Sequence, residues 1–289
     1  MEVTVSRPDK LLWPEPEVSK QVYVDYLGAV AEDMLPWLRA RPLTLVRAPD
    51  GVGGERYFQK SAPSYAPSWI RTVEIPAPSA GKDVRYLVCD RSETLAWLGN
   101  QAAVEFHPAP VRLDRLDRPD LFVIDVDPPD EAFDAAVEAT RLVLEVLSDL
   151  GIDAALKTTG GKGLHVVVPI ERRYGANELR AAAATLTDLV ASRRPDFVTG
   201  EFRKAKRAGR VMLDPSRNAP GATVVAPYSP RARAEGTVSF PLVPDDLGRV
   251  RPEEFTIRTV PDRLRDPGPA AWRELSNARP QRLPQALRS

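Results

Sequence analysis

The feature that most constrains the fold is the order of apolar patterns between residues 121 and 214. Some segments are continuous apolar runs, typical of buried strands, and others repeat apolar residues at helical spacing. The patterns predict four strands and two helices, at 121–126 (strand), 131–150 (helix), 152–158 (strand), 164–170 (strand), 177–192 (helix) and 210–213 (strand). This β-α-β-β-α-β order is the split βαβ arrangement of ferredoxin-like domains.

This topology predicts which distant residues meet. The first and third strands are central neighbours in it, and the fourth strand pairs with the first. The first strand ends with Asp125 and Asp127, the third carries His165, and the fourth ends at Asp214. We therefore expect these four side chains to converge at one site.

The remaining segments carry weaker patterns. Residues 19–38 show helical spacing after Ser19, a suitable N-cap, and predict a helix. Residues 41–110 mix short apolar runs with turn signals and predict short strands and irregular loops. From about residue 263 the chain is rich in Pro and Arg, and we expect residues 279–289 to be disordered or loosely attached.

Composition and charge exclude several classes of protein. The single cysteine, Cys89, excludes an intramolecular disulfide framework and a cysteine-based zinc site. No apolar run approaches the roughly 20 residues that cross a membrane, and the start lacks the apolar region of a signal peptide. We expect an intracellular, soluble protein without a membrane partner. The 40 Lys and Arg balance 40 Asp and Glu, so the net charge argues neither for nor against nucleic acid.

Basic residues nevertheless crowd around Asp214. A run of this kind is most often a solvated surface. Its position beside a candidate catalytic aspartate favours contact with phosphate instead. Its members are Arg193, Arg194, Arg203, Lys204, Lys206, Arg207, Arg210 and Arg217.

The pair Asp125 and Asp127 carries the first chemical signal. Residues i and i+2 of a strand point to the same face, so the two carboxylates lie side by side and repel unless a cation joins them. Hard divalent ions take oxygen ligands, and a third carboxylate from Asp214 completes a cage for two ions, as used in in-line phosphoryl transfer. The plainer interpretation is a strand that ends before the turn Pro128-Pro129. The strand context and the third aspartate favour the metal site.

The glycine-rich segment 157–165 carries the second signal. Glycines let backbone N–H groups approach phosphate oxygens, Lys162 adds a charge and Thr159 adds a hydroxyl. Gly160 and Gly163 belong to the same candidate set, and His165 is placed to donate to a triphosphate oxygen. The spacing is not that of a Walker A loop. A plain glycine hairpin is the alternative.

Two further segments hold weaker candidates for the same cleft. His107, in Glu105-Phe106-His107-Pro108, precedes the first strand of the core. Ser229 and Arg231 lie in Tyr228-Ser229-Pro230-Arg231, and arginine suits bidentate contact with phosphate. Either segment alone is an ordinary structural element or surface loop.

Together these residues resemble a known family. Asp125-Val126-Asp127-Pro128, Thr159 to His165 and Val211-Met212-Leu213-Asp214 match the three motifs of the archaeo-eukaryotic primase superfamily, and the chain most resembles the polymerase domain of bacterial ligase D, the enzyme of non-homologous end joining. The similarity covers roughly residues 1–262. Supporting segments are Pro8 to Pro14, Ser19-Lys20, Arg41-Pro42-Leu43, Phe58-Gln59-Lys60, Glu105 to Pro108, Arg217-Asn218, Tyr228 to Arg231 and Phe255 to Arg258.

The resemblance implies a fold and a division of the chain. It implies a mixed α/β (α+β) primase-polymerase fold, with an RRM-like or ferredoxin-like βαββαβ core packed against an N-terminal mixed α/β subdomain. We expect one primase-polymerase domain over 1–262, with the subdomain at 1–118, the core and flanking strands at 119–262, and a tail at 263–289. The length leaves no room for ligase or phosphoesterase domains, so we expect a stand-alone polymerase or a domain of a larger protein.

The resemblance also implies roles for single residues. Asp125, Asp127 and Asp214 would bind two Mn²⁺ or Mg²⁺ ions, and Thr159, Lys162, His165 and Arg231 would hold the incoming triphosphate. Arg47 joins the nucleotide candidates, although relatives often carry Lys-Arg and an aromatic where this chain has Val46-Arg47-Ala48. Lys10 and Lys20 stand where relatives grip a downstream 5′-phosphate, and Phe58 stands where an aromatic stacks on the template, with Lys60 beside it.

The implied function is template-dependent nucleotidyl transfer that extends 3′ ends and fills short gaps at DNA breaks, often with ribonucleotides. Two alternatives stay open: a primase that starts chains without a primer, and a DNA-end-binding module that recruits other proteins with little catalysis. Expected partners are DNA with 5′-phosphorylated gaps or ends, NTP or dNTP, and, as candidates, Ku and a DNA ligase. We expect a monomer in the bacterial cytoplasm, associated with the nucleoid.

Overall fold

The structure is a computed structural model that describes residues 3–77, 81–130 and 132–288. Its internal contacts divide the chain into two compact units, which are described separately. Unit 1 comprises Met1–Asp114, Thr223–Ser239 and Glu253–Arg265, and unit 2 comprises Arg115–Ala222, Phe240–Pro252 and Asp266–Ser289. The functional boundaries expected from the sequence stay a prediction.

Unit 1 contains a five-stranded antiparallel sheet with β3 at its centre. β3 pairs with β4, β6 and β7, and β5 pairs with β6, while β1 and β2 form a separate hairpin. The strands are β1 (Leu11–Trp13), β2 (Val18–Ser19), β3 (Leu43–Arg47), β4 (Tyr57–Gln59), β5 (Thr72–Ala77), β6 (Lys82–Leu87) and β7 (Ala103–Pro108). The helices are α1 (Lys20–Ala29), α2 (Ala31–Leu38) and α3 (Ser92–Asn100).

The helices of unit 1 partly follow the sequence patterns. Ser19 caps α1 as expected, and its Oγ accepts a hydrogen bond from the Val22 N–H at 3.3 Å. The predicted single helix is interrupted at Val30, which separates α1 from α2. The prediction of only strands and loops in 41–110 is wrong for α3. That helix is too short for a clear periodic pattern and gains its stability by packing on α1, where a Cβ at Gly99 would lie 2.6 Å from Leu27 Cδ1.

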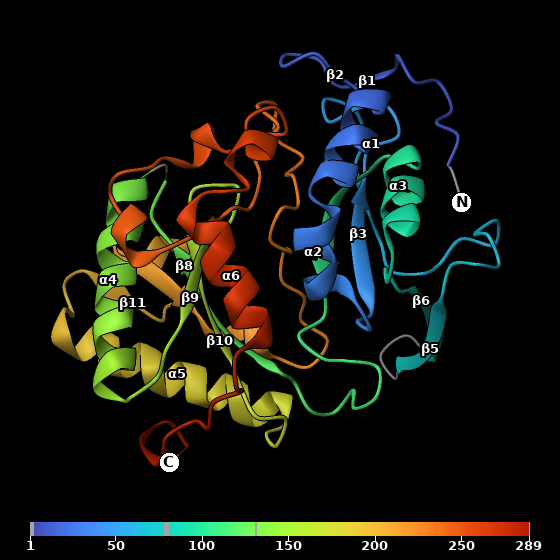
Figure 1. Cartoon of the computed structure of the whole chain (residues 1–289). Helices are drawn as coiled ribbons and strands as arrows, with labels where there is room; N and C mark the ends of the chain where they lie inside the picture. The colour runs from blue at the N-terminus through green and yellow to red at the C-terminus, as the bar shows by residue number, and fades with distance from the viewer. Residues whose placement is uncertain (1–2, 78–80, 131, 289) are drawn as a thin grey trace. The chain divides into compact units, whose positions relative to one another are not determined.

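Unit 2 is built on the predicted β-α-β-β-α-β order. Its sheet runs β11-β12-β8-β10-β9-β13, so the fourth, first, third and second core strands lie side by side as expected. The strands are β8 (Leu121–Asp127), β9 (Ala155–Thr158), β10 (Leu164–Pro169), β11 (Val198–Thr199), β12 (Val211–Asp214) and β13 (Pro241–Leu242). Helices α4 (Phe133–Asp149) and α5 (Ala176–Arg193) contact each other and both contact β8, so they cover one face of this sheet (Figure 1).

The C-terminal residues belong to unit 2 and are well anchored. Helix α6 (Pro267–Asn277) contacts β9 and β13, and Trp272 Nε1 donates to the Leu156 carbonyl at 2.7 Å. Beyond it, the Gln281 side chain pairs with both backbone groups of Asp153, and Leu283 and Leu287 are buried. The expectation of a loosely attached tail is therefore wrong. Isolated apolar anchors among prolines and arginines form no local pattern, so only the tertiary contact reveals them.

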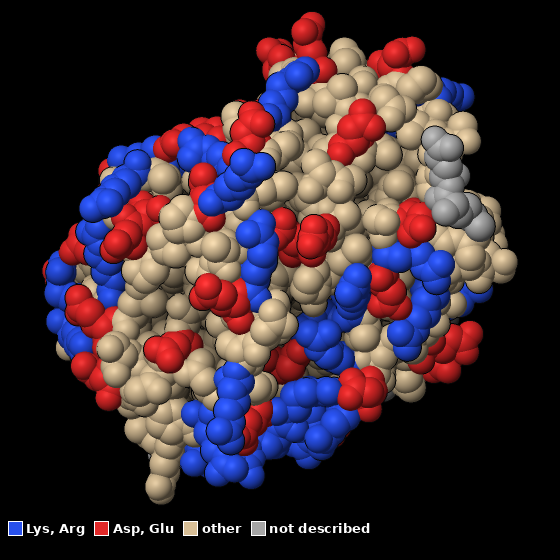
Figure 2. Space-filling view, in the orientation of Figure 1, with Lys and Arg blue, Asp and Glu red and all other residues tan. Residues whose placement is uncertain are grey.

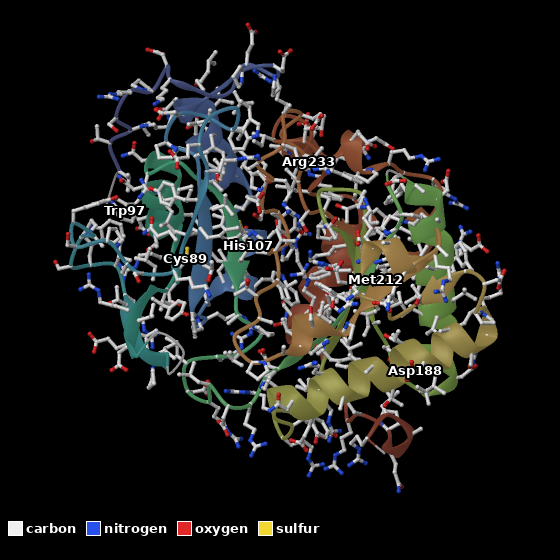
Figure 3. The ribbon with its side chains drawn as sticks, turned by 180° about the vertical axis from the view of Figure 1, so that it is seen from behind. Cys89, Trp97, His107, Asp188, Met212 and Arg233 are labelled. Atoms are coloured by element: carbon white, nitrogen blue, oxygen red, sulfur yellow. The ribbon has the colours of Figure 1, made fainter. Side chains whose placement is uncertain are left out.

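Within the described residues, no helix is both long and apolar enough to cross a bilayer. Cys89, labelled in Figure 3, is a free and buried thiol, and burial raises its pKa well above the ordinary value. Basic and acidic side chains intermingle on the face of the molecule shown in Figure 2. Along the lower edge of this view, basic side chains predominate.

Candidate active site

The site in unit 2 is a row of ionisable residues across four neighbouring strands. Asp214 of β12 and His165 of β10 both stand directly opposite Asp125 of β8, and Lys157 of β9 stands opposite His165. Residues that face each other across a sheet share one of its faces. The predicted convergence of three segments is therefore confirmed, and a lysine lengthens the row.

Asp125 lies at the centre of this row. Its Oδ2 is 2.7 Å from Arg217 Nε, and its Oδ1 is 3.4 Å from His165 Nε2. Burial opposes ionisation of this side chain, which is 10% exposed. Hydrogen bonds from His165 and Arg217 and the positive charge of Arg217 outweigh that penalty and hold the pKa of Asp125 well below its usual range. The carboxylate is ionised at neutral pH.

The other two carboxylates also face cations. Asp127 Oδ2 accepts from Arg207 Nη1 at 2.8 Å, and its Oδ1 is 3.5 Å from Lys162 Nζ. Asp214 Oδ1 accepts from the backbone N–H of Ser216 at 2.8 Å, and its Oδ2 is 3.9 Å from Arg217 Nε. Each carboxylate of the candidate metal site thus has a positive neighbour in this unit.

The donor set fits hard divalent cations. Three carboxylates on adjacent register positions offer only oxygen ligands, the chemistry that Mg²⁺ and Mn²⁺ select. Over the described part of the chain, no three acidic, histidine or cysteine side chains already converge as a formed metal cluster. Arg207 and Arg217 lie on carboxylate oxygens that divalent ions would bind.

Asn218 secures Asp214 beside Asp125. Its side chain exchanges two hydrogen bonds with the backbone of Val123, accepting from the N–H at 2.9 Å and donating to the carbonyl at 2.7 Å. β12 ends at Asp214, and the short 3₁₀ helix Pro215–Asn218 follows it. The Asn218 side chain thus makes the backbone hydrogen bonds to β8 that a continued strand would otherwise make. The turn after Asp214 is therefore tied directly to β8.

The glycine hairpin between β9 and β10 is held by Thr159. The Thr159 hydroxyl donates to the Gly163 carbonyl at 3.1 Å and accepts from the N–H groups of Gly161 and Gly163. Gly160 adopts a φ of 67°, and a Cβ at Gly163 would collide with the Val126 carbonyl. Lys162 extends from this hairpin to the Pro128 carbonyl at 2.9 Å. The hairpin thus lies against the end of β8, with two of its amides turned inward to Thr159.

The basic run around Asp214 serves several purposes. Arg193 and Arg194 form ion pairs with Asp149 and Glu138 of α4. Arg207 is buried, and its guanidinium also donates to the carbonyls of Glu201 and Phe202 while it reaches Asp127. Only part of the run is therefore a solvated surface.

Unit 1 contains a second carboxylate–histidine cluster on β7. Buried Glu105 accepts from the Ala232 N–H at 2.9 Å, lies 2.7 Å from His107 Nε2 and lies 3.1 Å from Arg231 Nε. Burial alone would raise the pKa of Glu105. The hydrogen bond and charge of His107 and the charge of Arg231 have the larger, opposite effect and lower this pKa to about 2. The exposed Phe58 ring lies 6.3 Å from the His107 ring. The structure thus brings together His107, Arg231 and Phe58, which the sequence placed in three segments.

Two other nucleotide candidates are placed differently in unit 1. Ser229 is fully buried, and its Oγ accepts from the Phe106 N–H at 2.9 Å. Arg47 stands opposite Tyr57 across β3 and β4, whereas its neighbour Val46 stands opposite Phe58. Arg47 therefore faces away from Phe58 and donates to Tyr65 and Gln59. Contact of either residue with nucleotide stays a prediction.

The DNA candidates Lys10 and Lys20 are neighbours in unit 1. The Lys20 N–H donates to the Lys10 carbonyl at 2.8 Å. Lys20 Nζ also bonds to the Ser6 carbonyl, and burial together with Lys10 and Arg7 lowers its pKa. Lys10 Nζ pairs with Asp50 at 2.9 Å. Lys60 is exposed just beyond β4.

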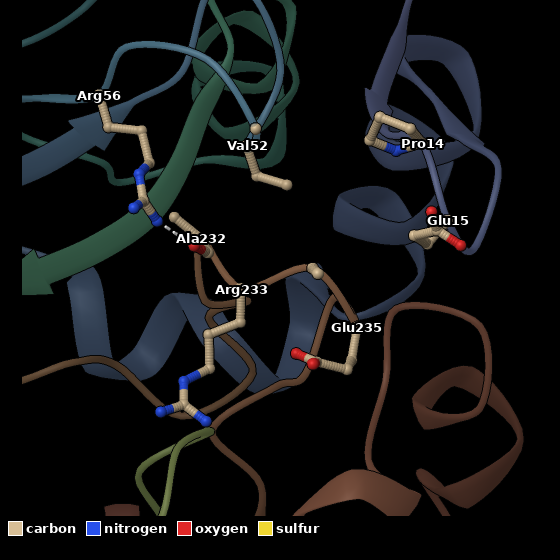
Figure 4. Close-up of a pocket in the computed structure, with 9 residues that line it drawn as sticks. Pro14, Glu15, Val52, Arg56, Ala232, Arg233 and Glu235 are labelled. Atoms are coloured by element: carbon tan, nitrogen blue, oxygen red, sulfur yellow. Dashed lines mark hydrogen bonds between the residues drawn. The ribbon is translucent and has the colours of Figure 1, made fainter.

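A separate cavity of about 550 Å³ in unit 1 is lined by other residues. Glu15, Arg233 and Glu235 reach into it, and Arg56 donates to the Ala232 carbonyl at its edge (Figure 4). None of the residues expected to bind nucleotide or DNA lines this cavity. It is not the expected catalytic site.

Several residues of these clusters were not predicted as site residues. Lys157 had no role, and Arg207 and Arg217 were named only as members of the basic run expected to contact phosphate, because strand register and loop path alone bring them to His165, Asp127 and Asp125. Glu105 carried a usable signal, since its i, i+2 spacing from His107 places both on one face of a strand.

Comparison with known proteins supports the resemblance. The family model of the LigD primase-polymerase domain matches residues 19–280. The multifunctional non-homologous end joining protein LigD of Pseudomonas aeruginosa is 36% identical over 289 residues, which cover 99% of this chain and 34% of that protein. The bifunctional non-homologous end joining protein LigD of Bacillus subtilis is 32% identical over 263 residues, 90% of this chain and 42% of that protein. The chain thus spans less than half the length of these relatives.

A solved structure agrees with the same assignment. The polymerase domain from Mycobacterium tuberculosis ligase D in complex with DNA matches with a TM-score of 0.88 at 29% sequence identity. The match covers 96% of this chain and 99% of that one. The predicted mixed α/β fold is confirmed.

Proposed function

The chain belongs to the family of LigD primase-polymerase domains, and from this premise we propose that it is a template-dependent nucleotidyltransferase acting at DNA breaks. It extends 3′ ends and fills short gaps opposite a template. The observation that carries the proposal is the row Asp214, Asp125 and His165 on adjacent strands, with Asp127 two residues along β8.

Asp125, Asp127 and Asp214 would hold two Mg²⁺ or Mn²⁺ ions. When bound, such ions lower the pKa of an attacking 3′-hydroxyl and stabilise charge on the transferred phosphorus and the pyrophosphate. The chain's own cations then have a second use. Arg207, Arg217 and Lys162, once released from the carboxylates, are free to bind phosphate oxygens, and His165 donates from Nε2.

The remaining roles in nucleotide and DNA binding are also proposals. Thr159, Gly160 and Gly163 shape the hairpin that receives the triphosphate, and Arg231, His107, Ser229 and Arg47 are the nucleotide candidates of unit 1. Lys10 and Lys20 bind a 5′-phosphate of the DNA, Phe58 stacks on the template, and Lys60 contacts the DNA backbone. Ribonucleotide preference, a monomeric state, action with Ku and a ligase, and a cytoplasmic location near the nucleoid belong to the same proposal.

A primer-extension assay tests the proposal. The protein is incubated with a primer–template, NTPs or dNTPs and Mn²⁺, and we expect extension that Asp125→Ala abolishes. The matched control is Asp188→Ala, an exposed aspartate on α5 of the same unit (Figure 3), which should leave extension unchanged. Robust synthesis by the Asp125 variant would refute the assignment.

Two further measurements separate the two alternatives. Products made on unprimed single strands would identify a primase. Tight binding of 5′-phosphorylated DNA without binding of nucleotide or Mn²⁺ would identify a recruitment module. The presence of all three aspartates and His165 argues for catalysis.

A further inference from the structure

Lys157 is a buried lysine for which the proposed chemistry has no role so far. It lies on β9, between β10 and the edge strand β13 of the unit 2 sheet, with only 1% of its surface exposed. Lysine is rarely buried to this degree unless its ammonium has a specific partner. Here Lys157 Nζ lies 2.8 Å from Nδ1 of His165, the residue directly opposite on β10.

The two contacts of the His165 ring decide which nitrogen carries its proton. Nε2 faces Asp125 Oδ1 at 3.4 Å, and an ionised carboxylate can only accept a hydrogen bond. A neutral imidazole has one donor and one acceptor nitrogen, so a proton on Nε2 leaves Nδ1 to accept from Lys157. A doubly protonated ring would set two donors against each other at 2.8 Å. The geometry therefore selects the neutral Nε2–H tautomer.

We propose that Lys157 is a positioning residue for nucleotidyl transfer, which orients His165 so that its one N–H faces the carboxylates and the incoming triphosphate. Lys157 acts on Nδ1 and touches no substrate. The inference rests on the proposed function, since it explains how His165 presents a donor where phosphate charge develops. It adds a fourth strand, β9, to the catalytic apparatus.

Imidazole NMR tests the tautomer without any need for catalysis. The chain has two histidines, so protein labelled with ¹⁵N-histidine gives two ring systems, and a His107→Gln variant assigns them. We expect a protonated Nε2 in His165 of the wild type. In Lys157→Met, which removes the donor and leaves an unbranched side chain of similar size, we expect the Nδ1 signal to shift toward that of an acceptor nitrogen without a hydrogen bond. The His107 signals provide the internal control and should not change.

Kinetics then test whether the tautomer matters for activity. Lys157→Met should lower kcat/KM for nucleotide incorporation about tenfold, but less than twofold in a His165→Gln background, where a fixed amide replaces the ring. A loss of equal size in both backgrounds would show a merely structural lysine and overturn the proposal. An Nδ1–H tautomer in the wild type would also overturn it, even if Lys157→Met failed to fold. Absence of nucleotidyl transfer by the wild type would refute the proposed function and leave the NMR result interpretable.

Discussion

The two units each pair a carboxylate with a histidine, and the two pairs are assembled in different ways. Asp125 and His165 meet across β8 and β10, at 3.4 Å, in a row that continues to Asp214 and Lys157. Glu105 and His107 lie two residues apart on β7, at 2.7 Å. One pair depends on the register of several strands, and the other on the pleat of a single strand.

The partners of the two carboxylates differ in a way that matches their expected roles. Glu105 is tied to a backbone N–H as well as to two side chains, so its charge is fully used in holding Arg231 and His107. Asp125 is held by the side chains of Arg217 and His165. In the proposed function, Arg217, whose side chain is 43% exposed, is the partner that a metal ion would replace, whereas Glu105 remains an anchor for Arg231 and His107.

The sharpest test of this difference compares the two histidines. We expect His165→Ala to lower kcat/KM for nucleotide incorporation about 100-fold, because it removes a donor to charge that develops in the transition state. We expect about a tenfold loss for His107→Ala, mainly through KM, because His107 is assigned to nucleotide binding. Steady-state kinetics with a primed template measure both. Equal losses in kcat for the two variants would remove the distinction between the clusters.

A second test concerns the anchor. Glu105→Gln keeps the shape of the side chain but removes the charge that binds Arg231 and His107, and should lower the free energy of unfolding by about 1–3 kcal/mol at pH 7. The measurement is urea unfolding, with exposed Glu74→Gln of the same unit as the matched control.

The same variant has a predicted dependence on pH. The pKa of Glu105 is about 2 in the folded chain, below the ordinary value of 4.5. Between pH 2 and pH 4.5, Glu105 therefore binds a proton in the unfolded chain but not in the folded chain. The stabilisation is complete above pH 4.5 and is lost as the pH falls toward 2. The deficit of Glu105→Gln relative to wild type should shrink over this interval. A deficit that stayed constant down to pH 2 would show that the charge of Glu105 is not its source.

The smallest expected effect concerns the binding of DNA by Lys10, a residue outside both histidine clusters. Lys10→Ala should reduce the preference for 5′-phosphorylated gaps severalfold, and lower the slope of affinity against salt by about one, without changing the KM for nucleotide. Asp50→Ala, which frees Lys10 from its ion pair, should leave that preference intact or strengthen it. Binding titrations on phosphorylated and unphosphorylated gapped DNA provide the readout. Equal loss of affinity for the two DNAs in Lys10→Ala would contradict a phosphate contact.

Local patterns in the sequence determined a large part of this structure. The β-α-β-β-α-β order follows from apolar periodicity, and the shared faces of Asp125 with Asp127, and of Glu105 with His107, follow from a spacing of two residues on a strand. The helix cap at Ser19 and the turn at Gly160 likewise depend on residues close in sequence. Such features need only the chain's short-range geometry.

Only the tertiary structure decided which residues complete each cluster. A shift of one residue in the pairing of β10 with β8 or β9 would turn His165 away from Asp125 and Lys157, and nothing local in the sequence excludes that shift. The same holds for the contacts of Arg207 with Asp127 and of Gln281 with Asp153, which join residues far apart in the chain. Strand pairing likewise decided that Arg47 faces away from Phe58. The energies of these contacts depend on burial and register, which exist only once the sheets have formed.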